Sequence, residues 1–332
     1  MKVNSPEDCT PPVNLFFYEL FKTYIWDINS LIHFFMHVKI IPSILISMCC
    51  IFLTGQESTE IYLFDLQEQD STISLSNPLN ISAREGYDNQ PSFTDDSQAI
   101  LFSSFRNGQS DISKYFINEH YRVWITDTDA NEFSPMPYPG KKKYFTCVRL
   151  NGDQTQFLYK YAYKKRPPEL LIPDLRVGYY LWFDEKSLIS FVIGDVESLQ
   201  VSNFKYKIRY PIQKNIGRSI QKIPASAGLG PQLVSFISLE HESPEIYAVD
   251  PMTSDSKYIT DPIEGSQDLA WTKNGSMLMG HGNKIFRFHP QKDSEWQPVT
   301  IECPLPLDGI SRIVISPDGT KIAVVVNEIV RK

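Results

Sequence analysis

A motif of alternating apolar and polar positions recurs along the chain from residue 93 onward. An apolar residue is followed by a polar turn and then by a short apolar strand. Four copies have the same offset of nine residues between their ends: 93–102, 182–191, 271–280 and 315–324. A longer copy begins at Val148, and a degenerate one begins at Ile223. Alternation with a period of two is typical of half-buried strands, so each copy predicts a β-hairpin.

The polar turn in these copies carries residues that favour a tight reversal. Ser316-Pro317-Asp318-Gly319 places proline at the second turn position and glycine at the fourth, which suits a type I turn. Aspartate, asparagine or glycine also occurs in the turns of the other copies. The motif therefore predicts two short antiparallel strands joined by a turn.

A second pattern follows some of the hairpins. An Ile-Tyr pair, or a similar pair such as Ile-Phe, precedes an acidic or proline-containing turn at 245–251 and 284–290. A weaker copy occurs at 111–116. We interpret each as an outer strand that closes one unit. The first residues of the six hairpins are about 44 residues apart on average, the period of a four-stranded propeller blade. They are Phe93, Val148, Trp182, Ile223, Trp271 and Ile315.

One copy of the second pattern, at 60–66, precedes the first hairpin and has no hairpin of its own. The last hairpin ends at 323–327 with no outer strand after it. We therefore expect 60–66 to pair with 321–327, so that the N-terminal strand closes the last blade and Tyr62 lies near Val325. Closure of a six-bladed ring would leave no long open sheet edge.

The residues around the first hairpin make the pattern more specific. Arg84-Glu-Gly-Tyr-Asp-Asn-Gln-Pro-Ser-Phe93, followed by Asp95-Asp96-Ser97 and Ile100-Leu101-Phe102, resembles the WD40-like repeat of the TolB family and of related secreted bacterial propellers. The resemblance covers about residues 57–327 and implies an all-β, six-bladed β-propeller. TolB proteins carry an additional N-terminal α/β domain that has no counterpart here, so their role with Tol partners is not implied.

The first 55 residues differ from the rest. Residues 40–53 form an uncharged, mostly apolar run of 14, shorter than the roughly 20 residues that a membrane span needs. The run fits the apolar region of a secretory signal. We predict translation from Met36, a mis-called extension over 1–35, a signal peptide over 36–55 and a propeller over 57–332. The mature protein would then be periplasmic or secreted.

Two alternatives concern this leader. Residues 12–53 would instead form a membrane anchor if the whole leader is made and retained. Cys49 would be a lipidation site if the signal is of the lipoprotein type, although Met48 is not the small residue expected before such a cysteine. Sequencing of the mature N-terminus distinguishes these cases.

Charge and motif content exclude several classes of function. Lys plus Arg is 32 and Asp plus Glu is 39, a net charge of −7, which argues against a basic face that neutralises nucleic-acid phosphates. There is no Gly-x-Ser-x-Gly elbow, P-loop or His-Glu-x-x-His motif. Outside the leader, only Cys147 and Cys303 remain, too far apart in sequence for a metal motif or disulfide framework. No cofactor, metal or catalytic residue is predicted.

The candidate binding site is the central channel, which the first strand of each blade lines. The residues three positions before the hairpin starts are Gln90, Phe145, Tyr179, Ile220, Asp268 and Arg312. Loops just upstream add Arg84, Glu85, Tyr87, Asp88 and Tyr180. We predict a binding site at the channel mouth from Arg84, Glu85, Tyr87, Asp88, Tyr179, Tyr180, Asp268 and Arg312. In the alternative interpretation, Asp268 and Arg312 only neutralise each other.

Together these features favour a non-catalytic interaction module in the cell envelope, a monomer that binds an envelope protein or a peptide. The alternative is a propeller enzyme, or a receptor for a sugar or another small ligand, that uses the channel, with a divalent metal held by acids from several blades. Asp268 is the only acidic residue in the inner row, and Glu85 and Asp88 come from one blade. Metal analysis of the purified protein distinguishes the two.

Overall fold

A computed structural model describes residues 58–69, 72–164, 166–304 and 307–328. The predicted leader over 1–55, including Met36 and Cys49, lies outside these residues. Within the described ranges, the chain contains no helix with the length and apolar character needed to cross a membrane. The only helix there is a short 3-10 turn, η1 (Ala225–Ala227), and strands make up most of the rest.

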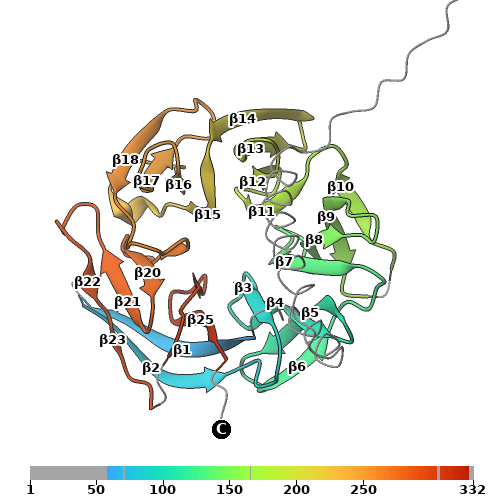
Figure 1. Ribbon diagram of the computed structural model, residues 1–332, viewed down its shortest axis with the longest axis horizontal. Coiled ribbons are helices and arrows are strands. Elements are labelled where there is room, and N and C mark those ends of the chain that lie inside the picture. Colours follow the sequence, from blue (N-terminus) through green and yellow to red (C-terminus); the bar gives the residue numbers. More distant parts are fainter. Residues whose placement is uncertain (1–57, 70–71, 165, 305–306, 329–332) are drawn as a thin grey trace, which may run out of the picture. The chain divides into compact units, whose positions relative to one another are not determined.

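The described strands form six sheets around a central axis, which confirms the predicted six-bladed β-propeller (Figure 1). Blade 1 contains β3 (Asp88–Phe93), β4 (Ala99–Arg106), β5 (Gln109–Phe116) and β6 (Tyr121–Trp124). Blade 2 contains β7 (Asn131–Pro137), β8 (Tyr144–Leu150), β9 (Gln156–Ala162) and β10 (Glu169–Ile172). Blade 3 contains β11 (Val177–Trp182), β12 (Ser187–Val192), β13 (Ser198–Asn203) and β14 (Ile208–Lys214).

The second half of the ring continues the same arrangement. Blade 4 contains β15 (Ile216–Lys222), β16 (Val234–Ser238), β17 (Glu245–Val249) and β18 (Ser256–Thr260). Blade 5 contains β19 (Leu269–Trp271), β20 (Met277–His281), β21 (Lys284–Phe288) and β22 (Gln297–Pro298). Blade 6 combines β24 (Arg312–Ile315) and β25 (Lys321–Asn327) with β1 (Thr59–Gln69), β2 (Thr72–Asn80) and β23 (Thr300–Ile301).

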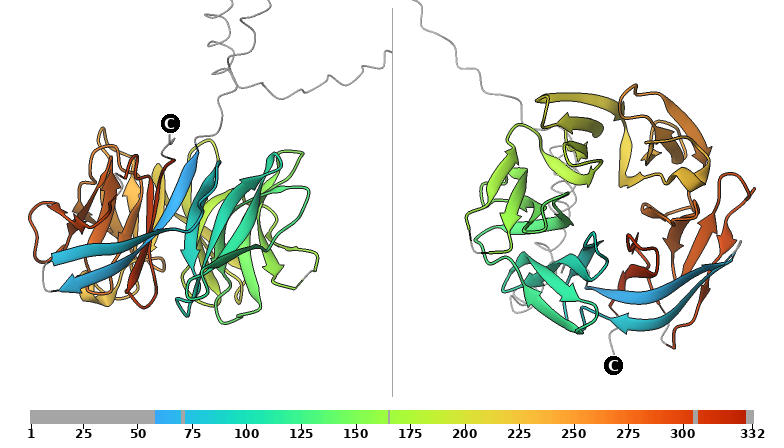
Figure 2. Two further views of the ribbon diagram at one scale, coloured as in Figure 1. Left: turned by 90° about the horizontal axis from the view of Figure 1, so that it is seen from below. Right: turned by 180° about the vertical axis from the view of Figure 1, so that it is seen from behind.

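The two ends of the propeller meet in blade 6, as predicted. β1 pairs antiparallel with β25, and the register places Ile61 opposite Val325 and Tyr62 opposite Val324. The N-terminal contribution is a whole hairpin, because β2 continues the sheet beyond β1 (Figure 2). Apolar side chains from both ends, including Phe64 and Val324, share one buried cluster. The closure therefore rests on packing as well as on the strand ladder.

A fifth strand covers the outer edge of blade 6. β23 runs parallel to β2, with Ser74 opposite Thr300 and Leu75 opposite Ile301. The strand lies in the connection from blade 5 to blade 6, and its pairing across the closing hairpin was not predicted. The short strand protects the middle of the β2 edge, at Ser74 and Leu75, from pairing with another chain.

The predicted outer strands are in fact the third strands of their blades. β5, β17 and β21 are each followed by one more strand, namely β6, β18 or β22. These true outer strands are short and partly exposed, so their hydrophobic alternation is weak. The second pattern therefore marks the third strand of these blades, and their fourth strands were not predicted.

Blade 2 requires a second correction. The hairpin that begins at Val148 is formed by β8 and β9, the second and third strands, and the inner strand is β7. Pro135 and the positive φ of Ser134 (51°) accompany an irregular register within β7, and they disrupt its alternation of side chains. Phe145 therefore does not line the channel. Its ring is fully buried between blades 1 and 2, beside Cys147.

The turn chemistry of the repeat is confirmed at Ser316–Gly319. The Gly319 amide donates to the Ser316 carbonyl at 2.8 Å, and Gly319 has a φ of 77°. The Asp318 carboxylate accepts hydrogen bonds from the Thr320 amide and hydroxyl. The side chain of aspartate thus holds the turn through local bonds to the chain that follows it.

Candidate functional site

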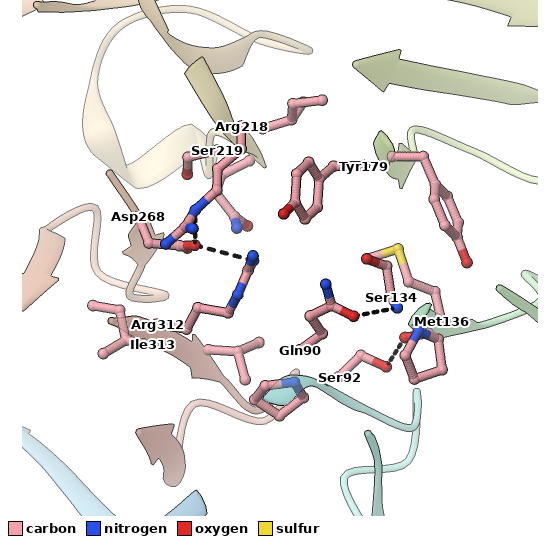
Figure 3. Close-up of a pocket in the computed structure, with 16 residues that line it drawn as sticks. Gln90, Ser92, Ser134, Met136, Tyr179, Arg218, Ser219, Asp268, Arg312 and Ile313 are labelled. Carbon is pink, nitrogen blue, oxygen red and sulfur yellow. Dashed lines mark hydrogen bonds and ion pairs between the residues drawn. The ribbon is translucent and has the colours of Figure 1, made fainter. Parts of the chain in front are cut away.

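All six blades contribute to a small central cavity of about 120 Å³ (Figure 3). The charged residues come from one half of the ring, where β15 supplies Arg218, the residue before β19 is Asp268, and β24 supplies Arg312. The opposite half supplies uncharged groups such as Gln90 and Ser134. The cavity is therefore polar but strongly asymmetric.

The charged half is organised around one carboxylate. The Arg312 Nη1 group donates to Asp268 Oδ2 at 3.2 Å, and Arg218 Nε lies 3.6 Å from the same oxygen. Arg218 also donates through Nη2 to the Ser311 carbonyl at 3.0 Å, which links blades 4 and 6. The three side chains are between 10% and 27% exposed, so water screens these charges only partly.

Burial dominates the titration of the central acid. It raises the pKa of Asp268 above its ordinary value, and the guanidinium groups of Arg312 and Arg218 oppose that rise. The predicted neutralisation of Asp268 by Arg312 is present, but Arg218 adds a second cation. One carboxylate therefore faces two positive charges.

Aromatic side chains adjoin this network. The Arg312 guanidinium carbon lies 4.9 Å from the centre of the Tyr179 ring, within the range of a cation–π contact. Tyr179 in turn packs edge-on against Phe191. Burial raises the pKa of Tyr87 to about 12, although Arg312 and Arg218 act in the opposite direction, so its phenol is neutral at physiological pH. Tyr87 thus adds no counter-charge to the site.

The uncharged half is also pre-oriented. Gln90 Oε1 accepts hydrogen bonds from Ser103 Oγ at 2.9 Å and from the Ser134 amide at 2.8 Å. These bonds fix the side-chain amide, and its nitrogen points toward the middle of the cavity (Figure 3). Gln90 has a φ of 56°, a left-handed conformation that side chains seldom adopt. The surrounding structure therefore holds a strained residue in place at the channel.

Comparisons of the fold with solved structures identify bacterial propellers. A protein described as TolB from Agrobacterium tumefaciens aligns with a TM-score of 0.62 and 13% identity, over 83% of this chain and 100% of that one. TolB from Acinetobacter baumannii aligns with a TM-score of 0.51 and 13% identity, over 82% of this chain and 65% of that one. The fold is a TolB-like six-bladed β-propeller.

An oligogalacturonate lyase from Vibrio parahaemolyticus has the same fold, with a TM-score of 0.51 and 12% identity over 80% of this chain and 86% of that one. No family model and no curated protein matches the sequence. At 12–13% identity, the likeness to these solved structures concerns the fold and leaves the chemistry to the residues of this chain.

The TolB-like propeller brings four of the eight predicted site residues to the cavity wall. They are Tyr179, Tyr180, Asp268 and Arg312. Tyr180 is only 6% exposed, and its hydroxyl donates to Thr146 Oγ1 of blade 2 at 2.9 Å. The Tyr180 hydroxyl therefore joins two blades, whereas Tyr179 presents its ring to the charged network.

The other predicted residues lie apart from the cavity wall. Tyr87 precedes β3, and its carbonyl accepts a hydrogen bond from the Phe105 amide at 2.9 Å. Glu85 is exposed. Arg84 donates to the Phe105 carbonyl at 3.1 Å, and Asp88 is buried with its carboxylate 3.7 Å from Arg122.

Arg84 and Asp88 belong to an arginine cluster within blade 1. The guanidinium carbons of Arg84, Arg106 and Arg122 lie 5.4, 4.3 and 5.0 Å from the ring of Trp124. Arg106 also bonds to Asp111 at 2.7 Å. These contacts hold the short outer strand β6 against its neighbours, and acids nearby offset the positive charge.

Arg218 is the main site residue that the sequence analysis missed. Counting three positions back from Ile223 identified Ile220, which does line the cavity. Arg218 lies two positions earlier on the same strand, and side chains two apart share a face of a strand. Extending the alternation along β15 would have found it.

The channel opens toward two larger hollows. A depression of about 860 Å³ is lined by the C-terminal ends of the inner strands of all six blades, and its walls include several of the hairpin starts: Phe93, Trp182, Ile223, Trp271 and Ile315. A groove of about 760 Å³ lies beside the N-terminal end of β15 and shares Arg218 with the central cavity. Among the residues described, no cluster of three or more His, Cys, Asp or Glu side chains has the geometry of a metal site.

Proposed function

We propose that the chain is a non-catalytic binding module of the cell envelope, which acts as a monomer and holds a protein or peptide at the mouth of its channel. The TolB-like propeller supports the interaction role, because a closed ring supplies a rigid framework for loops and channel residues. The apolar run over 40–53 supports export.

One observation carries the binding role. The polar side chains of the cavity are held by bonds to one another, with Asp268 between two arginines and Gln90 fixed by Ser103 and Ser134. Groups fixed in this way recognise a ligand without rearranging, which reduces the entropic cost of binding. Hollows adjoining the cavity give a partner room to approach.

The test uses the full chain, expressed with its own leader in a bacterium that has an outer membrane. We expect a periplasmic or secreted product whose mature N-terminus lies near Gln56. Retention of residues 1–35 would contradict the signal-peptide proposal. Recovery in the membrane with residues 12–53 intact would support the anchor alternative.

Partner binding is tested by cross-linking in the envelope and identification of the captured protein. A variant with Tyr87→Phe, Asp268→Asn and Arg312→Gln should lose the captured protein. Arg209→Gln serves as the control. Arg209, on β14, forms an exposed ion pair with Asp174, and neither residue lines the cavity. Equal capture by both variants would argue against the channel as the binding surface.

The alternative is a channel enzyme, or a receptor for a sugar or small ligand, that uses a divalent metal. The lyase that shares this fold is the observation in its favour. It predicts a stoichiometric divalent ion in the purified protein and loss of activity or ligand binding after chelation. Elemental analysis of the periplasmic product tests it directly.

A further inference from the structure

Several side chains on the walls of the central cavity offer hydrogen-bond donors. Gln90 Oε1 is already occupied by two donors, so the amide nitrogen is the group that it offers to the cavity. Arg312 carries a guanidinium with five N–H groups, which bonds to Asp268 and to the Tyr179 hydroxyl and has further N–H groups to offer. The Tyr179 hydroxyl also points into the space between them (Figure 3). A ligand that accepts hydrogen bonds therefore matches this wall.

The charge balance favours an anion. Arg218 and Arg312 together carry two positive charges, and Asp268 is the one acid on the described cavity wall. A buried cation without a full counter-charge is costly, and a bound anion would relieve that cost. The excess is one charge, which suits a carboxylate better than a phosphate monoester carrying about −1.5 to −2.

The cavity also has the right size and access. A single water needs about 10–15 Å³ of such space, so about 120 Å³ accommodates several waters or the carboxylate group that replaces them. Arg218 lines both this cavity and the 760 Å³ groove. The groove wall includes Ile216, Ile237 and Ile263, which would contact the apolar part of a ligand whose acid group reaches Arg218.

We propose that the central cavity binds a single carboxylate, which enters from the groove and is held by Arg218, Arg312, Tyr179 and the amide nitrogen of Gln90. Two sources share this chemistry, namely the C-terminus of a peptide and the side chain of an aspartate or glutamate. The proposal deepens the proposed binding function, on which it rests, by specifying the group that the channel recognises.

The test compares matched small probes at low salt, in a buffer without carboxylates. N-acetylglycylglycine carries a free carboxylate, and its C-terminal amide is the neutral control. N-acetylaspartate α-amide presents a side-chain carboxylate. Binding is followed by chemical shifts of the arginine Nε–H signals. We expect one or both acids to shift the signals of Arg218 and Arg312, and the neutral amide to leave them unchanged. The acid that binds with higher affinity indicates whether the natural ligand is a peptide C-terminus or an acidic side chain.

Variants with opposite expected effects make the result decisive. Arg312→Gln should weaken the carboxylate probe by about tenfold or more, because it removes a charge-assisted hydrogen bond. Asp268→Asn should tighten it, because the competing acid is lost. If Asp268→Asn does not fold, Gln90→Glu replaces the donor with a second acid and should abolish binding. Arg209→Gln should leave the affinity unchanged.

Equal binding of the acid and the amide, or unchanged affinity in Arg312→Gln, would overturn the proposal. Tighter binding of inorganic phosphate than of the carboxylate probes would overturn the assignment to a single carboxylate. The proposed function fails separately: a partner captured equally by wild type and Arg312→Gln keeps the interaction role and removes the carboxylate site. Carboxylate binding without any captured partner keeps the site and removes the interaction role.

Discussion

Asp268 and Glu132 are two buried acids near the start of inner strands, but their surroundings differ. Asp268 faces the channel and two guanidinium groups. Glu132, on β7, is fully buried between blades 1 and 2, where Thr128 and Tyr161 donate to its Oε1 atom. Its Oε2 atom has no hydrogen-bond partner among the residues described. The channel therefore pairs its acid with cations, whereas the contact between blades surrounds its acid with uncharged donors.

The difference shows how position in the ring decides the charge state of an acid. Burial raises the pKa of Glu132 to about 7, and the nearby charge of Asp111 adds to the rise. Such an acid is largely protonated below neutral pH and needs no cation. Burial also raises the pKa of Asp268, but there the guanidinium groups of Arg312 and Arg218 oppose the rise. Four substitutions test this contrast, in order of decreasing expected effect.

Replacing Asp268 with alanine should have the largest effect. The change leaves Arg218 and Arg312 facing each other without a counter-ion, and breaking a buried ion pair costs about 3–5 kcal/mol. We expect the free energy of unfolding to fall by about 3 kcal/mol at pH 7, measured by chemical denaturation. Adding Arg312→Gln to the same chain should recover part of the loss. An unchanged stability in Asp268→Ala would show that water screens the network.

Glu132→Gln should instead increase the free energy of unfolding above neutral pH. The pKa of Glu132 is about 7 in the folded chain against an ordinary 4.5, so the folded state holds a proton that the unfolded state releases. Its stabilising contribution is fully present below pH 4.5 and is lost as pH rises toward 7. The glutamine variant should be more stable than wild type by about 2–3 kcal/mol at pH 8, and similar at pH 4.

Denaturation at pH 4, 6 and 8 measures this effect. The wild type should lose stability between pH 4 and 8 relative to Glu132→Gln. Parallel pH profiles for the two chains would mean that Glu132 is ionised in the folded state and would remove the contrast with Asp268.

Asp88 is an intermediate case, because burial raises its pKa to about 6 although Arg122 lies 3.7 Å away. The folded pKa again exceeds the ordinary 3.8, so the contribution is lost between about pH 4 and pH 6. Asp88→Asn should reduce the loss of stability between pH 4 and pH 6 by about 1–2 kcal/mol. At higher pH the unpaired Arg122 should offset part of this gain. A pH profile that matches the wild type between pH 4 and 6 would contradict this.

Arg209→Gln should have the smallest effect. Arg209 and Asp174 form a pair whose side chains are 37% and 63% exposed. Exposed pairs contribute about 0–1 kcal/mol, so the midpoint of denaturation should hardly change. A large loss would mean that exposure is a poor guide to the value of ion pairs in this ring.

The chain's local patterns predict most of its architecture. The four hairpin copies with a nine-residue offset and the degenerate copy at Ile223 identified the inner strands of five of the six blades, and the unpaired copy at 60–66 predicted the closure with 321–327. This succeeded because the alternation of apolar and polar residues along a strand depends on near neighbours. In β7, Ser134 and Pro135 interrupt that alternation, and the inner strand of blade 2 was therefore missed.

The site depended less on local pattern. Tyr179, Asp268 and Arg312 were predicted by their position on inner strands, and the structure places all three at the cavity. Arg84 and Asp88 were included for their closeness in sequence to β3, but their side chains join the cluster around Trp124. Distance along the chain says little about which of two sides a residue faces.

The amino-acid sequence by itself determined the number of blades and the meeting of the two chain ends, because strand alternation and turn chemistry are encoded within short segments. Only the tertiary structure decided that Arg218 and Arg312 share one carboxylate and that Glu132 lies among uncharged donors. Arg218, Asp268 and Arg312 come from three different blades, and Tyr161 lies two strands away from Glu132 in blade 2. Their distances, and hence their charge states, are set by how the blades pack around the axis.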